Sequence, residues 1–326
     1  MSFIILVAVF IISCLIIYFA GEWVVDGIMN VARYLGWKEF VLSFLVMAFF
    51  GSLPNLFVGI SSALQGIPEL SLGEIISGNI INLTIVLALP ILLMGKAIEI
   101  KSKTIEITSF FVLGAIIFPV ILLLDGDLSR VDGLMLIFYY FSYIFWLFSK
   151  KERFKKPFDE ELCRTNEGLC NSFLVFLKGL SKTVLGIALI IIAAQGIVWS
   201  SQGLAAGLNM PLILVGIFIV GFGNALPEIY FAIKCSEKDN TYMILGNLMG
   251  SVVTTATLVL GIVSFISPIS IAGFENFALA RAFLLVACSA FFIFSKTDGK
   301  VSKKEALALV VIYVLFLIVE TLISTF

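Results

Sequence analysis

The sequence contains no histidine, and charged residues occupy only 13% of its 326 positions. Without imidazole, a histidine proton relay and most transition-metal sites are excluded, so oxygen atoms are the expected ligands for any bound cation. The five cysteines are scattered singly, which argues against a disulfide framework or a zinc site. The chain also lacks the paired acids and metal-binding motifs that an intramembrane enzyme would need. We therefore expect neither an enzyme nor a resident cofactor.

The chain is instead rich in long apolar segments. Hydrophobic residues make up 60% of the sequence, more than the core of a soluble protein of this length can bury. Runs of about 17 to 25 apolar residues span roughly 30 Å of hydrocarbon, and ten such runs occur here. They are predicted near residues 3–20, 38–64, 71–95, 104–124, 131–149, 172–199, 210–234, 241–268, 276–295 and 304–325. The predicted fold class is an all-α polytopic membrane protein with ten transmembrane helices.

The basic residues predict the orientation of these helices. Of the 21 lysines and arginines, 19 fall in one alternate set of loops, and only Arg130 and Arg281 fall in the other. The positive-inside rule makes the basic face cytoplasmic, so both termini are expected outside the cytoplasm. The short central linker favours a prokaryotic cell membrane. A net charge of −1 gives no indication of nucleic acid, and the expected partners are membrane lipid and small inorganic cations, with a monomer as the simplest assembly.

An internal repeat relates the two halves of the chain. Pro54 matches Pro227 and Gly73 matches Gly246, both at an offset of 173 residues. With five predicted spans in each half, the second copy enters the membrane from the opposite face, so the repeat is inverted. The expected organisation is an N-terminal five-helix repeat at 1–149, a charged cytoplasmic linker at 150–171, and a C-terminal five-helix repeat at 172–326.

Each copy of the repeat predicts an ion site at the centre of the membrane. Proline and glycine within an apolar run indicate a broken helix, and inverted repeats bind substrate where such helices meet. An ionised side chain at bilayer centre costs about 2.5 to 3.5 kcal/mol, so Glu228 is a functional candidate, with a structural polar contact as the alternative. Oxygen-bearing side chains gather in the same segments: Ser52, Asn55, Asn79, Asn82, Thr84, Asn224, Asn247, Ser251, Thr254, Thr255 and Thr257.

These motifs resemble those of the sodium/calcium exchanger family, within the calcium/cation antiporter superfamily, over essentially the whole chain. The family repeats read G-T-S-L-P-E and then G-N-x-x-G-S, with Asn or Asp four residues after the Ser. The second copy here reads Gly223-Asn224-Ala225-Leu226-Pro227-Glu228 and Gly246-Asn247-Leu248-Met249-Gly250-Ser251, followed by Thr255. The resemblance implies alternating access, in which sodium or protons enter down their gradient while calcium leaves through one central site. It also implies that the first and sixth spans slide.

The sequence departs from the family pattern where the ions are expected to bind. Typical members carry an acidic residue after Leu-Pro in each repeat, whereas here the first is Asn55 and only Glu228 is acidic. The late acidic or amide position of the second repeat is Thr255. Calcium takes about six to eight oxygen ligands, and its affinity rises with the number of carboxylates. Sodium/calcium exchange is therefore the leading expectation, and exchange of monovalent cations is the alternative.

The predicted cation ligands combine one carboxylate with neutral oxygens from both repeats. They are Glu228, Asn55, Asn82, Ser52, Ser251, Asn224 and Thr255, with the backbone carbonyls of Gly51 and Gly223. Glu74 replaces the Asn of the first G-N-x-x-G-S motif and is a candidate second acid, either in the site or at an aqueous entrance. A non-transporting ion sensor would keep the same ligands, and only flux would distinguish it. A channel would not need inverted repeats with broken helices.

Overall fold

The computed structural model describes residues 3–34, 49–95, 97–100, 103–149, 173–237, 241–271, 274–297 and 299–324. Within this part of the chain, nine helical spans are long and apolar enough to cross a membrane. The second predicted span is represented by α3, Leu53–Leu64, because the beginning of that span lies outside the described residues. The predicted linker at 150–171 also lies outside them.

The elements follow the predicted order in both halves of the chain. The N-terminal half contains α1 (Phe3–Tyr34), α3, α4 (Pro68–Ile81), η2 (Asn82–Val86), α5 (Leu87–Met94), β1 (Ile98–Glu99), α6 (Lys103–Leu122), η3 (Leu123–Asp125), β2 (Asp127–Leu128) and α7 (Arg130–Ser149). The C-terminal half contains α8 (Phe173–Leu208), α9 (Leu212–Val215), η6 (Gly216–Val220), α10 (Gly221–Glu237), α11 (Thr241–Val253), η7 (Thr254–Val259), α12 (Leu260–Ile266), β3 (Ile269–Ser270), α13 (Phe274–Lys296), β4 (Lys300–Val301) and α14 (Lys303–Ser324).

The two halves repeat each other element by element. A shift of 173 residues carries α1 onto α8, and the elements from α4 to α7 onto those from α11 to α14, with bounds that agree within three residues. Matching helix caps strengthen this correspondence. Ser129 and Asp132 cap the start of α7 with reciprocal hydrogen bonds, and Ser302 and Glu305 do the same for α14. The predicted fold class is confirmed.

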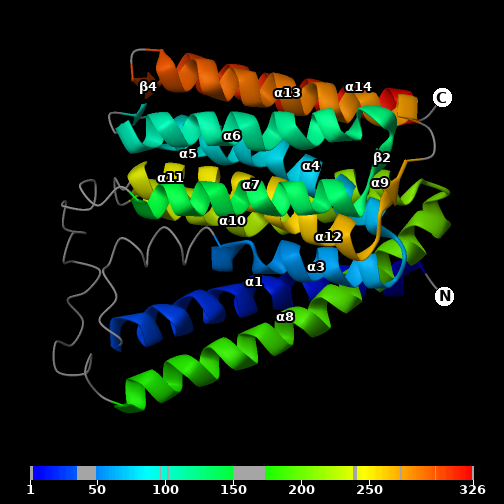
Figure 1. Cartoon of the computed structure of the whole chain (residues 1–326), viewed down its shortest axis with the longest axis horizontal. Coiled ribbons are helices and arrows are strands. Elements are labelled where there is room, and N and C mark those ends of the chain that lie inside the picture. The colour runs from blue at the N-terminus through cyan, green and yellow to red at the C-terminus, as the bar shows by residue number, and fades with distance from the viewer. Residues whose placement is uncertain are drawn as a thin grey trace.

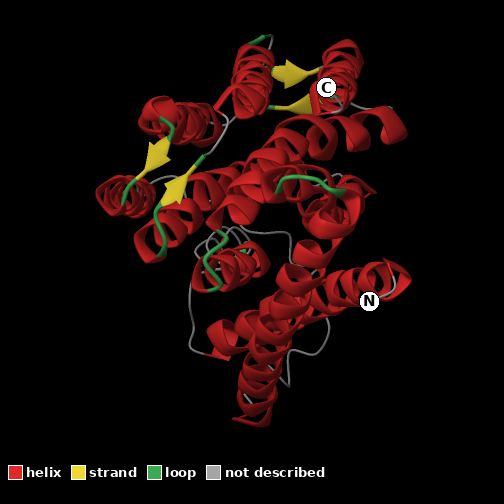
Figure 2. Ribbon diagram, turned by 90° about the vertical axis from the view of Figure 1, so that its right-hand side faces the viewer, coloured by secondary structure: helices red, strands yellow, loops and turns green. Residues whose placement is uncertain are grey.

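Short strand pairs join the two halves at opposite ends of the bundle. β1 pairs with β4, and β2 pairs with β3, both antiparallel (Figures 1 and 2). The repeat offset carries β1 close to β3 and β2 onto β4. Each pair therefore contains one strand from each half. The inverted repeat is in this way tied together near both membrane surfaces.

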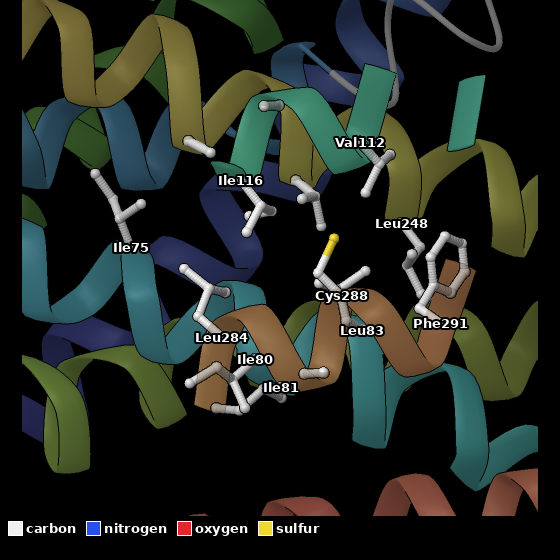
Figure 3. Close-up of a cluster of buried hydrophobic side chains, with 14 of the residues drawn as sticks. Ile75, Ile80, Ile81, Leu83, Val112, Ile116, Leu248, Leu284, Cys288 and Phe291 are labelled. Carbon is white, nitrogen blue, oxygen red and sulfur yellow. The ribbon is translucent and has the colours of Figure 1, made fainter. Parts of the chain in front are cut away.

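The centre of the bundle is formed by two matching spans. In an apolar 18-residue stretch of each span, 78% of the residues are buried for the span from Pro68 to Met94 and 83% for the span from Met243 to Ile266, against 28% for the first span. Helices α6 and α13 pack against these central spans through Val112, Ile116 and Cys288 (Figure 3). The polar residues predicted to bind cations lie mostly on the central spans and on α3 and α10. They are thereby held away from lipid.

The central helices are interrupted, but the interruptions do not coincide with the predicted proline motifs. π-helical turns break the α-helical pattern at η2, η6 and η7. Pro54 stands in the first turn of α3, and Pro227 lies inside the continuous helix α10. Because proline has no N–H, the carbonyl of Gly223, four residues before Pro227, lacks its usual helical donor. The extra residue in each π turn instead changes the direction of the following side chains.

Helices α1 and α8 form an inclined antiparallel pair beside the remaining bundle (Figures 1 and 2). Their backbones approach closely at glycines: a Cβ on Gly27 would lie 2.6 Å from the Gly179 carbonyl oxygen, and one on Gly186 would lie 2.9 Å from the Ala20 carbonyl oxygen. Small residues allow such close packing between membrane helices. The pair meets the rest of the bundle mainly through α3 and α9.

The sequence underestimated the length of α1, which was predicted to end near residue 20. The helix runs for 32 residues, about 48 Å at 1.5 Å per residue, and it tilts accordingly. Glu22 and Asp26 ended the predicted apolar run, but both residues line a cavity. The helix can for that reason continue through two charged positions.

Candidate cation site

A cavity of about 650 Å³ lies between α1, the start of α3, α10 and α11. Its lining reaches Ser251 and Asn55 at one end and Asn30 and Lys234 at the other. Asn30 and Lys234 lie near the ends of α1 and α10, and the end of α1 packs against the start of α8. The cavity therefore extends from the middle of the bundle toward the end where α8 begins, which is the left side of Figure 1.

The cavity brings together predicted ligands from both halves of the chain. Its lining includes five of them: Gly51, Asn55, Asn224, Glu228 and Ser251. Asn247, which the sequence placed among the oxygen-bearing residues, also lines it. Glu228 is half-buried on α10, and within the described residues no ion pair involves it. The deep part of the cavity thus combines one carboxylate with amide and hydroxyl groups.

Three further predicted ligands are buried but do not line the cavity. The Ser52 hydroxyl lies 3.5 Å from the Ser251 hydroxyl, so these residues of opposite halves meet. Thr255 donates its hydroxyl proton toward Asn79 Oδ1 at 2.8 Å and the Ser251 carbonyl at 2.9 Å. Asn82 is buried at the start of η2, and its Oδ1 has no hydrogen-bond partner within the described part of the chain.

Gly223 is a further predicted ligand that does not line the cavity. Its Cα faces α1, because a Cβ at this position would lie 3.1 Å from Cys14 Sγ and 3.3 Å from the Phe10 ring. The sequence placed its carbonyl in the site from the proline spacing alone. A carbonyl direction depends on the helix rotation, which that spacing does not give.

Glu74 is buried on α4, with a relative exposure of 2%. The Asn224 amide donates from Nδ2 to Glu74 Oε1 at 2.5 Å. The second carboxylate oxygen, Oε2, has no hydrogen-bond partner among the described residues. Glu74 is absent from the cavity lining itself. It contacts the cavity indirectly, through an amide that does line it.

A glycine contact explains why Glu74 reaches the other half of the chain. A Cβ on Gly216 would lie 3.0 Å from the Glu74 backbone nitrogen and 3.2 Å from Gly73 Cα. A Cβ on Gly73 would overlap the Ile213 carbonyl. Only residues without side chains allow α4 and η6 to cross this closely. This crossing places Glu74 against the first turn of α10, where Asn224 lies.

The sequence did not predict the outer part of the cavity. Glu22 and Asp26 follow the predicted end of the first span; both are exposed, and both line the cavity. The Tyr18 hydroxyl donates to Glu22 at 2.9 Å, and Asp26 pairs with Lys182 of α8 at 3.3 Å. Tyr18, Glu22 and Asp26 follow each other at four-residue intervals on one helix face. That spacing was the signal for a polar face on a longer α1.

Comparisons with known proteins agree with this fold. The family model described as sodium/calcium exchanger protein matches residues 5–149 and 179–322. The sodium/calcium exchanger MaX1 of Methanosarcina acetivorans is 23% identical over 331 residues, covering 92% of this chain and 93% of that protein. An uncharacterized membrane protein of Methanocaldococcus jannaschii is 25% identical over 245 residues, with coverage of 75% and 76%.

A solved structure shows the same arrangement of helices. The sodium-calcium exchanger NCX_Mj, soaked with Na+ and Sr2+, matches with a TM-score of 0.66 at 22% identity, covering 96% of this chain and 98% of that one. The resemblance of the motifs, the inverted repeat and the match of the family model to both halves lead to one conclusion. The chain is an integral membrane protein that belongs to the sodium/calcium exchanger family of secondary cation transporters.

Proposed function

We propose that this chain exchanges sodium for calcium by alternating access, and that both ions bind in turn beside Glu228. The observation that carries this proposal is the convergence of Glu228, Asn55, Asn224 and Ser251 on one cavity in a member of this family. All four side chains offer oxygen atoms, which both Na+ and Ca2+ prefer as ligands. They come from both halves of the chain, as expected of a site between inverted repeats.

The one-sided cavity supports alternating access. It extends toward the end of the bundle that carries the linker, which the positive-inside rule predicts to be cytoplasmic. At the opposite end, Gln65 of the α3 C-cap joins α8 by hydrogen bonds with Gln195 at 2.9 Å and Gln202 at 3.3 Å. A movement of the α1–α8 pair that breaks these bonds would open that end. Both termini then lie outside the cytoplasm of a prokaryotic cell.

Exchange of monovalent cations is the second candidate, and the replaced acid favours it. Asn55 occupies the position after Leu-Pro in the first half, so Glu228 is the only carboxylate among the deep lining residues that the structure describes. Glu22 and Asp26 lie in the outer part, where Tyr18 and Lys182 bind them. A single carboxylate balances one monovalent ion, whereas a divalent ion leaves a positive charge in a low-dielectric cavity.

Transport by reconstituted protein tests the proposal. Proteoliposomes loaded with sodium are diluted into medium with radiolabelled calcium, and uptake is compared between the wild type and Glu228→Gln. We expect sodium-dependent calcium uptake that falls by at least about 100-fold in Glu228→Gln, because a buried ligand charge is lost. Glu69→Gln is the control, since it makes the same change at an acid outside the cavity lining.

Two other results would change the assignment. If calcium does not move while sodium or proton flux still requires Glu228, the function is monovalent exchange. If ions bind but no flux of calcium, sodium or protons is measured, the chain is a sensor and the transport proposal fails.

A further inference from the structure

The hydrogen bond between Glu74 and Asn224 fixes the direction of an amide in the cavity wall. A carboxylate accepts hydrogen bonds, so it binds Nδ2 of the amide and leaves Oδ1 on the other side. Asn224 Oδ1 is buried and has no hydrogen-bond partner within the described residues. Asn224 also lines the cavity one helical turn before Glu228. The contact therefore presents an oxygen, rather than an N–H group, to a cation in the site.

The charge of Glu74 has no counter-charge in the described part of the chain. Its carboxylate is buried, receives a hydrogen bond at Oε1 and has no partner at Oε2, and no ion pair there involves it. A carboxylate inside a membrane helix is costly unless a positive charge lies close to it. Only the Asn224 amide group would separate a cation bound by Asn224 Oδ1 from this carboxylate. Carboxylates in such outer positions orient ligands and strengthen their binding to metal ions.

The equivalent positions of the other half show that this arrangement occurs once. The repeat mates of Glu74 and Asn224 are Asn247 and Gly51. They meet in the same way, because a Cβ on Gly51 would lie 3.8 Å from Asn247 Oδ1. Because Gly51 has no side chain, that contact carries no charge and no hydrogen bond between side chains. The two acids, the buried Glu74 and the half-buried Glu228, lie on α4 and α10, which pack against each other.

We propose that Glu74 is a positioning residue of the cation site: it holds the Asn224 amide with Oδ1 toward the ion and supplies the second negative charge that a divalent cation requires. This inference rests on the proposed function. Of the two candidate functions, it favours transport of a divalent cation over exchange of monovalent cations. Under this proposal, Glu74 supplies the negative charge that the neutral Asn55 does not carry. It does so from a different helix, since Glu74 lies on α4 and Asn55 on α3.

Equilibrium binding to the purified full-length chain tests this role. Radiolabelled calcium is titrated in detergent and displaced with sodium, for the wild type, Glu74→Gln, Glu74→Leu, Glu228→Gln and the control Glu69→Gln. Gln keeps an oxygen that can accept from Asn224 but removes the charge, whereas Leu removes both. Because Coulomb energy scales with the charge of the ion, the fold loss for calcium should be about the square of that for sodium.

For Glu74→Gln we expect sodium affinity to fall by about 10-fold and calcium affinity by about 100-fold. Glu74→Leu should weaken both ions by about a further 5-fold, because the Asn224 amide is then free to rotate. A purely structural role would weaken both ions equally. Equal losses, or no loss, in Glu74→Gln overturn the inference, and this variant decides the question even if Glu74→Leu does not fold.

The Glu228→Gln variant separates failure of the inference from failure of the proposed function. If it abolishes binding while Glu74→Gln keeps the calcium-to-sodium preference of the wild type, only the role of Glu74 is overturned. If Glu228→Gln binds both ions normally, the cavity is not the site and both proposals fail. If the wild type binds sodium through Glu228 but no calcium, the divalent assignment is overturned and monovalent exchange remains.

Discussion

The first half of the chain has Asn55 where the second has Glu228, and the second has Asn247 where the first has Glu74. Each half thus carries one acid within the central repeat motif, but at a different position of that motif. Because α4 of the first half packs against α10 of the second, Glu74 binds Asn224, one helical turn before Glu228. An inverted repeat can therefore supply a symmetric scaffold for an asymmetric distribution of charge.

The hydroxyl groups of the two halves differ in a complementary way. Ser52 corresponds to Ala225, and Ser251 corresponds to Gly78, so each half supplies one serine. These two serines meet across the site, with 3.5 Å between their hydroxyl oxygens. Loss of a ligand in one repeat is compatible with a complete site when the other repeat provides an oxygen at the same place.

We expect the largest effect from a substitution at the crossing of α4 and η6, because this crossing creates the contact between Glu74 and Asn224. We expect Gly73→Ala to destabilise the protein by about 3 kcal/mol or more, since the added Cβ overlaps backbone atoms of Ile213 that cannot move aside. Thermal unfolding in detergent measures the effect.

Gly78→Ala is the matched control on the same helix. A Cβ there meets nothing within 4 Å, so this change should leave stability within about 1 kcal/mol of the wild type or raise it slightly. Equal unfolding temperatures for the two variants would show that the crossing does not require glycine.

An acidic residue at position 55 would make the two halves alike after Leu-Pro and so test the comparison between them. Asn55→Glu adds a carboxylate that lines the cavity opposite Glu228, and we expect calcium affinity to rise by about 10-fold or more. Sodium affinity should change by a smaller factor, because a monovalent ion gains half as much Coulomb energy. Calcium displacement by sodium provides the measurement. Unchanged competition would count against the charge argument.

Substitutions of Gln195 and Gln202, at the end of the bundle opposite the cavity, should give the smallest effects. Gln195→Leu removes the 2.9 Å hydrogen bond to Gln65, and the loss of about 1 kcal/mol should shift the balance of conformations by about 5-fold toward closure of the cavity. Labelling of an Asn30→Cys variant by a thiol reagent, corrected for the native cysteines, reports opening of the cavity. Gln202→Leu, which removes the 3.3 Å bond, should have less effect. Faster labelling in Gln195→Leu would contradict a latch at this end.

The sequence predicted the features that depend on local pattern. Apolar length gave the spans, and the constant offset between Pro54 and Pro227 placed Asn55 and Glu228 at equivalent depths. Because an inverted repeat brings equivalent depths together, these two residues were predicted in one site, and both line the cavity. The positions of π turns were not predicted, since no local residue pattern marks them.

The contacts between the halves could not be predicted in the same way. Glu74 and Asn224 are 150 residues apart, and their hydrogen bond depends on how closely α4 and η6 cross. Hydropathy also predicted that the first span ends near residue 20, because a charged residue is taken as a sign of the membrane surface. It does not distinguish that surface from a cavity within the bundle, where Glu22 and Asp26 lie.

Moving the acid from one half to the other tests the central claim most directly, namely that the two halves supply equivalent positions of one cation site. Sodium-driven calcium uptake is measured in proteoliposomes for Glu228→Asn alone and for Glu228→Asn combined with Asn55→Glu. We predict that the single variant loses at least about 100-fold of its activity and that the combined variant recovers about a tenth or more of the wild-type rate. A folded combined variant that is as inactive as the single variant would contradict the account.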